Sequence, residues 1–229
     1  MEHLRHIAII LDGNRRWAQK HALKPWEGHE AGSKTLKKLL KYWVDSDIPY
    51  LSLYTLSLDN FIKRSEIEKR FLFHLFKINF RELLEDELIH KGKVKVKILG
   101  KWELLPDKEL KKLLKEVMEK TKDYDKKTLS FLICYDGQDE IVNAVQKLIG
   151  KGVKKVTPEL IKQNLFTSEL PPVDLLIRTG GEKRLSGFLL WDASYAELYF
   201  TETLFPDSVP KTFDEAIEEY KNRKRRFGK

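Results

Sequence analysis

Two apolar runs, each followed at once by a polar cluster rich in glycine and arginine, most constrain how this chain can fold. The runs at 7–11 and 173–177 precede the clusters 12–17 and 178–184. Continuous apolar runs of this length are typical of strands that are covered on both faces, as in parallel sheets. Because the carboxyl ends of such strands share one edge of the sheet, we expect the two clusters to meet in one crevice.

The remainder of the chain alternates strand-like and helix-like stretches with short connections. The periodicity predicts further strands at 50–56, 93–99 and 128–135, and short apolar segments at 188–191 and 197–200. It predicts helices at 30–47, 65–90, 106–124, 139–149 and 158–165, and a last helix that opens with a capping box at Thr212 and Glu215. We therefore predict an α/β fold, with residues 1–229 forming a single domain whose mostly parallel central sheet is flanked by helices on both faces.

The composition limits the partners and the compartment. The formal net charge of +8 suits a polyanion, such as a nucleic acid, an anionic membrane surface or a phosphorylated substrate. The single cysteine, Cys134, excludes a disulfide within the chain, and its apolar surroundings favour a core thiol in a reducing cytosol. No apolar run approaches the roughly 20 residues that span a bilayer, so we expect any membrane contact to be peripheral.

The first polar cluster has the residue types of a magnesium and diphosphate site. Mg²⁺ prefers one or two carboxylates, with water and phosphate oxygens completing its shell, so Asp12 alone suffices if the substrate is a diphosphate. Gly13 and Asn14 free backbone amides to face a phosphate, and Arg15 and Arg16 add donors. The alternative is that Asp12 only caps the turn that follows it.

The second cluster predicts an anion clamp. Arg178 and Arg184 are planar donors suited to bidentate binding of a diphosphate, Ser186 adds a hydroxyl, and Glu182 holds the arginines in place. A tight surface turn with solvated charges is the alternative. Arg178 directly follows a strand too apolar for the surface, which favours the clamp.

Three further segments carry weaker signals. The segment 57–61 also leaves a strand at its carboxyl end, but its Ser, Asp and Asn are ordinary turn residues. Glu68 completes a capping box with Ser65, which is a sufficient structural role for its carboxylate. His29 is equally consistent with a phosphate donor or proton shuttle and with a polar neighbour of a helix start. The basic tail 221–229 alone indicates a solvated or polyanion-binding end.

Taken together, these motifs resemble those of the cis-prenyltransferase family over nearly the whole chain. The first signature is Asp-Gly-Asn-Arg-Arg-Trp at 12–17, followed by Gly-His-x-Ala-Gly at 28–32. The highly specific second signature is Arg-Thr-Gly-Gly-Glu-x-Arg-x-Ser at 178–186, followed by Phe-Leu-Leu-Trp at 188–191 and Tyr-x-Glu-Leu at 195–198. The ending Arg-Arg-Phe-Gly at 225–228 is similar to the family's carboxyl-terminal element.

The resemblance implies a fold with an apolar tunnel, distinct from the all-helical trans-prenyltransferases, in which Thr55 and the bulky run 131–133 are candidates for narrowing the tunnel. It implies repeated condensation of isopentenyl diphosphate with an allylic prenyl diphosphate, forming cis double bonds. Asp12 and Asn60 are then the catalytic residues, and Mg²⁺ is the cofactor, held by Asp12 and Glu197. Trp17 and Phe61 are expected to flank the allylic cation.

The middle signature departs from the family pattern. Asp59 and Phe61 are conservative changes, and one extra residue leaves Lys63 and Arg64 as alternatives for one arginine role. Lys24 stands where bacterial members carry arginine, and Lys183 replaces a histidine found near the metal in some members. The substrate-binding residues that the resemblance implies are Gly13, Asn14, Arg15, Arg16, Trp17, Lys24, His29, Ser57, Leu58, Asp59, Phe61, Lys63, Arg64, Glu68, Arg178, Glu182, Arg184, Leu185, Ser186, Arg226 and Gly228.

The resemblance also implies a homodimer, because the family's carboxyl-terminal element reaches a neighbouring subunit's site. We expect a cytoplasmic enzyme with peripheral membrane contact during product release. A nucleic-acid binder fits the charge but lacks a recognised motif. A noncatalytic partner subunit would have lost the site residues that this chain keeps, and a dinucleotide enzyme would need a Gly-x-Gly-x-x-Gly string.

Overall fold

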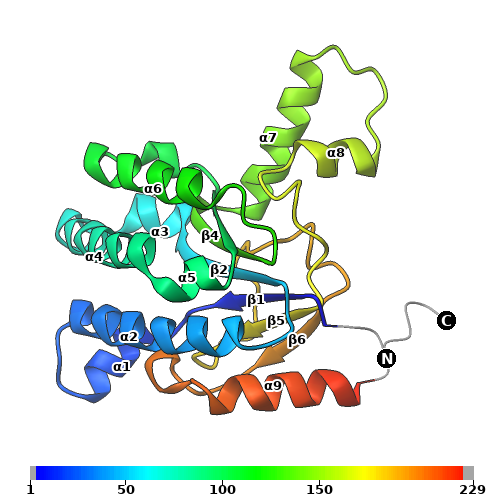
Figure 1. Cartoon of the computed structure of the whole chain (residues 1–229). Helices are drawn as coiled ribbons and strands as arrows, with labels where there is room; N and C mark the ends of the chain where they lie inside the picture. Colours follow the sequence, from blue (N-terminus) through cyan, green and yellow to red (C-terminus); the bar gives the residue numbers. More distant parts are fainter. Residues whose placement is uncertain (1–3, 224–229) are drawn as a thin grey trace.

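The computed structural model describes residues 4–223, which build one parallel sheet flanked by helices (Figure 1). Its strand order is β3-β4-β2-β1-β5-β6, and every neighbouring pair is parallel. The predicted α/β fold with a parallel sheet is therefore confirmed. The strands are β1 (His6–Ile10), β2 (Tyr50–Ser57), β3 (Val94–Leu99), β4 (Lys127–Tyr135), β5 (Leu175–Arg178) and β6 (Glu197–Phe200).

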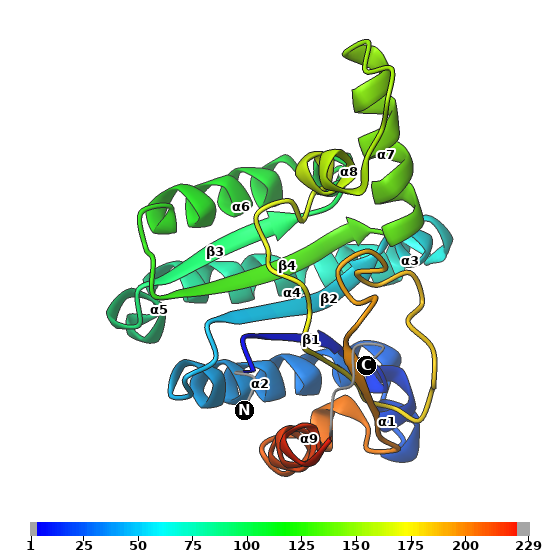
Figure 2. The same ribbon diagram turned by 90° about the vertical axis from the view of Figure 1, so that its right-hand side faces the viewer.

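Helices connect the strands and cover the sheet unevenly. One face packs against α2, α4, α5, α6 and α9, whereas irregular chain around 185–198 covers much of the other face (Figure 2). Among residues 4–223, no helix is long and apolar enough to cross a membrane. The helices are α1 (Asn14–Lys20), α2 (Pro25–Val44), α3 (Leu58–Lys63), α4 (Glu66–Glu85), α5 (Glu87–Lys91), α6 (Lys108–Thr121), α7 (Gly137–Gly150), α8 (Pro158–Asn164) and α9 (Lys211–Asn222), with short 3₁₀ turns η1 (Trp102–Leu104) and η2 (Phe205–Asp207).

The central strand β1 is buried on both faces, as its unbroken apolar run predicts. Its five residues are all buried. Alternate side chains point to opposite faces of a strand, so Ile7 and Ile9 belong to the larger core under the helices. Ala8 and Ile10 belong to a smaller core on the other face. Two separate cores thus fix the position of β1, and with it the loop that leaves its carboxyl end.

Several elements differ from the sequence prediction, beginning with α2, which spans Pro25–Val44 where a helix at 30–47 is predicted. The predicted helix 65–90 is divided at Asp86, whose extended backbone ends α4 and whose side chain caps α5 by accepting from the Leu88 amide at 2.9 Å. The capping box at Thr212 is wrong, because α9 begins at Lys211 and Thr212 is buried in its first turn. The short helices α1 and α3 occupy segments whose polar residues are typical of turns.

The topology brings three polar segments to one sheet edge. Strand β1 pairs with β2 on one side and with β5 on the other, and Ile10 pairs with both Tyr54 and Arg178. The segments that follow these three strands therefore leave the carboxyl edge side by side. In open parallel sheets, this edge is where ligands bind.

Candidate functional site

Asp12 and Arg178 lie against each other at the carboxyl edge of the sheet. Arg178 Nη2 donates to Asp12 Oδ2 at 2.9 Å, and Arg16 Nη2 lies 3.1 Å from Asp12 Oδ1. Arg178 is only 4% exposed, so the arginine side of this ion pair is withdrawn from water, whereas the carboxylate is partly exposed. The prediction that two clusters distant in sequence meet in one crevice is confirmed.

The second nitrogen of the same guanidinium organises the loop that follows β5. Arg178 Nη1 donates to Ser186 Oγ at 2.8 Å and to the carbonyl of Arg184. Its Nε is buried and has no hydrogen-bond partner among the described residues. Buried donors are rarely left unpaired, so this atom marks a place where an acceptor from a ligand can bind.

Glycine is required where this loop passes Arg16. Gly180 has φ 87°, and a Cβ there would lie 2.7 Å from Arg16 Nη2. A side chain would therefore displace the guanidinium that pairs with Asp12. Thr179 reinforces the same junction, because its hydroxyl donates to the Asp12 carbonyl at 2.7 Å and accepts from the Asp12 amide at 3.0 Å.

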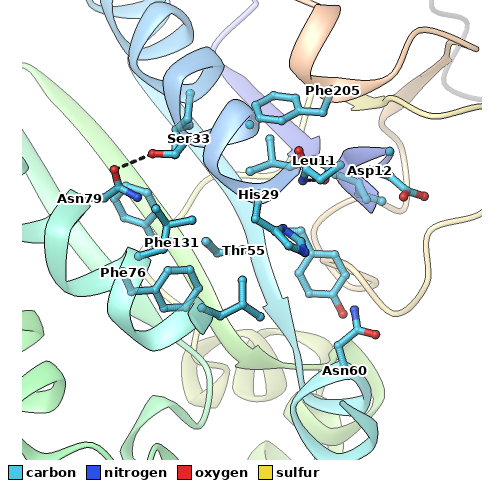
Figure 3. Close-up of a pocket in the computed structure, with 18 of the residues that line it drawn as sticks. Leu11, Asp12, His29, Ser33, Thr55, Asn60, Phe76, Asn79, Phe131 and Phe205 are labelled. Atoms are coloured by element: carbon cyan, nitrogen blue, oxygen red, sulfur yellow. Dashed lines mark hydrogen bonds between the residues drawn. The ribbon is translucent and has the colours of Figure 1, made fainter. Parts of the chain in front are cut away.

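The Gly-His-x-Ala-Gly motif packs α2 against α1 and presents a histidine to the site. A Cβ at Gly28 would lie 2.0 Å from the Asn14 carbonyl oxygen, and one at Gly32 would lie 2.2 Å from Asn14 Oδ1. Between them, His29 lines a cavity (Figure 3). Burial, together with the nearby Arg64 and Arg15, lowers the pKa of His29 to about 4, so the ligand-free protein holds this imidazole neutral near pH 7.

The middle signature forms the short helix α3 beside this cavity. Ser57 caps α3 by accepting from the Asn60 amide at 3.0 Å, and Asn60 lines the cavity. Arg64 also lines it, whereas Lys63 pairs with Asp59 at 2.7 Å on an exposed surface. The structure thus favours Arg64 over Lys63 for the open arginine position.

A cavity of about 700 Å³ extends from this polar cluster between α2, α4 and the sheet (Figure 3). Its polar end joins the carboxyl edge, and its remaining wall is mostly hydrocarbon. Such a space suits a ligand with an anionic head and an apolar tail. The apolar lining residues include Leu36, Leu40, Leu72, Leu75, Phe76, Phe80, Leu83 and Phe131.

The expected positions of Trp17 and Phe61 beside an allylic carbon are not supported. Trp17 donates to Asp207 Oδ1 at 2.8 Å and stacks on His21, and it is not among the residues that line the cavity. Phe61 packs toward Phe73, with ring centroids 6.5 Å apart, and is also outside the lining. Both rings are engaged in packing around their own short helices instead.

Other predicted substrate-binding residues lie outside the cavity lining. Glu68 Oε1 lies 3.8 Å from Nε of Arg15, which does line the cavity. Glu182 Oε2 lies 2.5 Å from Arg184 Nη1. Lys24 lies over the Trp26 ring. Leu58 and Leu185 do not line the cavity either. Arg226 and Gly228 are outside the described residues. The predicted residues that do line it are Asp12, Gly13, Asn14, Arg15, Arg16, His29, Ser57, Asp59, Asn60, Arg64, Arg178, Arg184 and Ser186.

Within one chain, the structure does not bring Glu197 to Asp12, the other expected magnesium ligand. Glu197 begins β6 and pairs with Leu175, at the amino end of β5, whereas Asp12 follows the carboxyl end of β1. The Glu197 carboxylate instead accepts from Arg223 Nη1 at 2.7 Å. Within 4–223, no three His, Cys, Asp or Glu side chains gather as a metal site. Asp12, whose side chain is 31% exposed, remains accessible to a cation that also binds phosphate oxygens.

Sequence reasoning missed Tyr54, whose hydroxyl contacts the backbone of the anion clamp at Ser186. Its hydroxyl lies 3.1 Å from the carbonyl oxygens of both Ser186 and Tyr135. The same side chain lines the cavity and stacks on Phe188, with centroids 4.6 Å apart. The available signal was the position of Tyr54 near the end of its strand, three residues before Ser57.

Comparisons with known proteins extend over the whole chain. A family model described as "Putative undecaprenyl diphosphate synthase" matches residues 10–228. The chain is 43% identical to an isoprenyl transferase of Rickettsia sibirica over 229 residues, covering 100% of both proteins. It is 41% identical to a tritrans,polycis-undecaprenyl-diphosphate synthase (geranylgeranyl-diphosphate specific) of Pyrococcus abyssi, covering 98% of this chain and 87% of that protein.

Two solved structures are similar to it. Lavandulyl diphosphate synthase from Lavandula x intermedia, in complex with dimethylallyl diphosphate, has a TM-score of 0.89 at 29% identity over 98% of both chains. A probable undecaprenyl diphosphate synthase from Campylobacter jejuni has a TM-score of 0.82 at 36% identity over 100% of both chains.

Proposed function

Because the chain belongs to the undecaprenyl diphosphate synthase family, and so is a cis-prenyltransferase that makes polyprenyl diphosphate, we propose that it condenses isopentenyl diphosphate with an allylic prenyl diphosphate. One observation carries this assignment of substrates. The buried Arg178, paired with Asp12 and Ser186, lies at the polar mouth of a cavity whose remaining wall is mostly apolar. That combination matches a substrate with a diphosphate head and a hydrocarbon tail.

The central chemical problem is the charge on the leaving group. As the allylic carbon–oxygen bond breaks, negative charge develops on the departing diphosphate and positive charge develops on carbon. Arg16, which Asp12 holds in place before substrate arrives, stabilises the developing anion on the allylic side, and Arg178 adds positive charge nearby. The low exposure of Arg178 strengthens this interaction, because few water molecules screen it.

The two substrates would divide the polar cluster between them. The allylic diphosphate lies near Gly13, Asn14, Arg15 and Arg16, which line the polar end of the cavity. The isopentenyl diphosphate lies near Arg178, Arg184 and Ser186. The buried and unpaired Arg178 Nε supports an anion on this side of the cluster.

Mg²⁺ fits this site when a diphosphate supplies the remaining oxygen ligands. Asp12 is the protein group that would hold it, since its carboxylate faces the cluster and is partly exposed. Bound there, Mg²⁺ would supply positive charge to the leaving diphosphate.

Loss of a proton ends each condensation, and Asn60 is positioned to guide it. Asn60 lines the cavity near its polar mouth (Figure 3). An amide is a poor base, so Asn60 orients the substrate while a diphosphate oxygen accepts the proton. His29 is neutral in the ligand-free protein and donates or accepts one hydrogen bond at the same mouth.

The proposal includes a homodimer in the cytoplasm that contacts a membrane surface when its lipid product leaves. The similarity of 225–228 to the family's carboxyl-terminal element supports the dimer, with Arg226 and Gly228 at the neighbouring subunit's site. The apolar tail of the product supports the membrane contact.

A direct test incubates the protein with labelled isopentenyl diphosphate, Mg²⁺ and short allylic diphosphates, followed by chromatography of the extracted lipid. We expect labelled polyprenyl diphosphate from the wild type and its loss with Asp12→Ala. Asp123→Ala, which changes an exposed aspartate between α6 and β4, is the matched control and should keep full activity. Equal incorporation by Asp12→Ala and Asp123→Ala would contradict the assigned site.

A further inference from the structure

Ser186 of the anion clamp and the residue after it have a backbone that other contacts must hold in place. Ser186 has φ 50° and Gly187 has φ 79°, both in the left-handed region. This region is unfavourable for a residue with a Cβ, and Ser186 is also exposed, so packing does not keep it there. The hydrogen bonds of this segment therefore decide where the Ser186 hydroxyl points.

Hydrogen bonds from different elements tie this segment to the rest of the protein. Arg178 Nη1 donates to Ser186 Oγ at 2.8 Å, and the Gly137 amide donates to the Gly187 carbonyl at 2.7 Å. Another comes from Tyr54, whose hydroxyl donates to the Ser186 carbonyl at 3.1 Å. Of these three bonds, the one from Tyr54 is the one that reaches the main chain of Ser186 itself.

Tyr54 is a rigid support for this bond. The residue is 9% exposed, and its ring stacks on Phe188 with centroids 4.6 Å apart and planes 12° apart. The hydroxyl also lies 3.1 Å from the carbonyl oxygen of Tyr135, a fully buried residue at the end of β4. A phenol has one proton, which these two carbonyls share, so the hydroxyl joins an exposed loop to a buried strand. Burial raises the pKa of Tyr54, so the hydroxyl keeps this proton at neutral pH.

The position of Ser186 matters because its hydroxyl can serve two partners at once. The oxygen accepts from Arg178, which leaves the hydroxyl proton available to a diphosphate oxygen. Rotation of the Ser186 main chain out of the left-handed region would move Oγ away from Arg178 and from an anion bound beside it. The bond from Tyr54 opposes this rotation, because the rotation would take the Ser186 carbonyl away from its donor.

We propose that Tyr54 is a positioning residue for isopentenyl diphosphate, because its hydroxyl holds the main chain of Ser186 in the conformation that presents Oγ to the diphosphate. This inference rests on the proposed function, which places isopentenyl diphosphate near Arg178, Arg184 and Ser186. The same proposal places the allylic diphosphate near residues 13–16, which Tyr54 does not hold. Tyr54 therefore affects the affinity for one of the two substrates.

Tyr54→Phe tests this selectivity, because it deletes one oxygen and keeps the ring that stacks on Phe188. Calorimetric titration with Mg²⁺ present measures the dissociation constant of each diphosphate alone, since neither is condensed without the other. We expect Tyr54→Phe to weaken the binding of isopentenyl diphosphate about fivefold, which is typical of one lost neutral hydrogen bond. The dissociation constant of the allylic diphosphate should equal that of the wild type.

Ser186→Ala shows whether Tyr54 acts through Ser186 or contacts the substrate directly. If the phenol positions Ser186 Oγ, deletion of this oxygen removes the group that it positions. Tyr54→Phe should then have little further effect on the binding of isopentenyl diphosphate in the Ser186→Ala background. An undiminished effect in that background would overturn the proposal, because the phenol would then act without Ser186.

Tyr42→Phe is the matched control, since it deletes a tyrosine hydroxyl outside the cavity lining. That hydroxyl, on α2, donates to Asp214 Oδ1 at 2.6 Å. Both dissociation constants of this variant should equal those of the wild type. If Tyr42→Phe weakened isopentenyl diphosphate binding as much as Tyr54→Phe, or if Tyr54→Phe weakened both substrates equally, the specific role of Tyr54 would be contradicted.

Failure of the proposed function and failure of this inference give different results. A wild-type protein that does not bind isopentenyl diphosphate would contradict the proposed function itself. Binding of equal strength by the wild type and Tyr54→Phe would leave the proposed function intact and overturn the positioning role of Tyr54.

Discussion

Arg178 contributes both of its terminal nitrogens to the site, one to Asp12 and the other to Ser186. A lysine has a single ammonium on a flexible stem and cannot hold both partners in one plane. The position therefore requires the shape of arginine as well as its charge.

Replacement of Arg178 by lysine tests this requirement. We expect Arg178→Lys to lower kcat/KM about 100-fold, which is typical of removing one preorganised donor to a developing anion. Arg70→Lys, at an exposed position on α4, should change it little. Steady-state rates with both substrates varied would decide, and a change below about twofold in Arg178→Lys would show that charge alone suffices.

His29 gives the ligand-free protein a dependence of stability on pH. Its pKa is about 4 in the folded state, against 6.5 as the ordinary value. Between these values the unfolded chain binds a proton that the folded protein does not, so stability falls as pH decreases from 6.5 toward 4. The full effect is at most about 3 kcal/mol.

The variant His29→Gln tests this dependence, because glutamine is polar but has no group that gains a proton between pH 7 and pH 4. We expect its urea-unfolding free energy to change less between pH 7 and pH 5 than that of the wild type. Burial also lowers the pKa of His6, which acts in the same direction in both proteins and cancels in the comparison. Identical pH dependence in the two proteins would rule out a contribution from His29.

At the scale of elements, the close packing of α1 on α2 depends on glycine. A Cβ at Gly32 would lie 2.2 Å from Asn14 Oδ1, whereas a Cβ at Gly150, near the end of α7, would meet nothing within 4 Å. We expect Gly32→Ala to destabilise the protein by about 1–3 kcal/mol through this clash. Gly150→Ala should be neutral or stabilising, because alanine favours helix. Thermal unfolding of both variants measures the difference, and similar midpoints would contradict the packing argument.

Sequence pattern located the elements better than their ends or their register. Apolar runs predicted β1 and β5, and the rule for parallel sheets then placed Asp12 beside Arg178. The pattern did not reveal α1 or α3, because Asn14 and Ser57 have residue types that also favour turns. The division at Asp86 interrupts an apolar periodicity that continues across it.

Register explains why Glu197 lies away from Asp12 within one chain. A motif gives the residue type of Glu197 but not which end of its strand it occupies. Its pairing with Leu175 places it at the amino end of β6, where Arg223 binds it. Likewise, Ser33 and Asn79 are polar residues on helices, a pattern that by itself indicates solvent and not a cavity wall.

At the scale of the whole molecule, the polar cluster and the apolar cavity form one continuous amphipathic site. Apolar residues of α4, including Leu72 and Phe76, supply part of its lining. If the protein forms the predicted dimer, residues from the neighbouring subunit complete each site. This expectation has a quantitative test.

Two inactive variants should restore each other's activity. Asp12→Ala lacks the carboxylate proposed to hold Mg²⁺, and a chain ending at Arg223 lacks Arg226 and Gly228. In a mixed dimer, the intact tail of the first would complete the site of the second. Random exchange of equal amounts would give roughly a quarter of wild-type activity, measured after co-refolding. Activity no greater than that of the separate variants would contradict a shared site.

The two ion pairs of Asp12 have a consequence for the order of binding events. In the ligand-free protein the single negative charge of the carboxylate lies between Arg16 and Arg178 and reduces the repulsion between their two positive charges. An arriving pyrophosphate competes for the same guanidiniums, and every donor it captures releases a carboxylate oxygen to receive a cation. Anion and cation affinities are therefore thermodynamically linked, and each is expected to tighten the other.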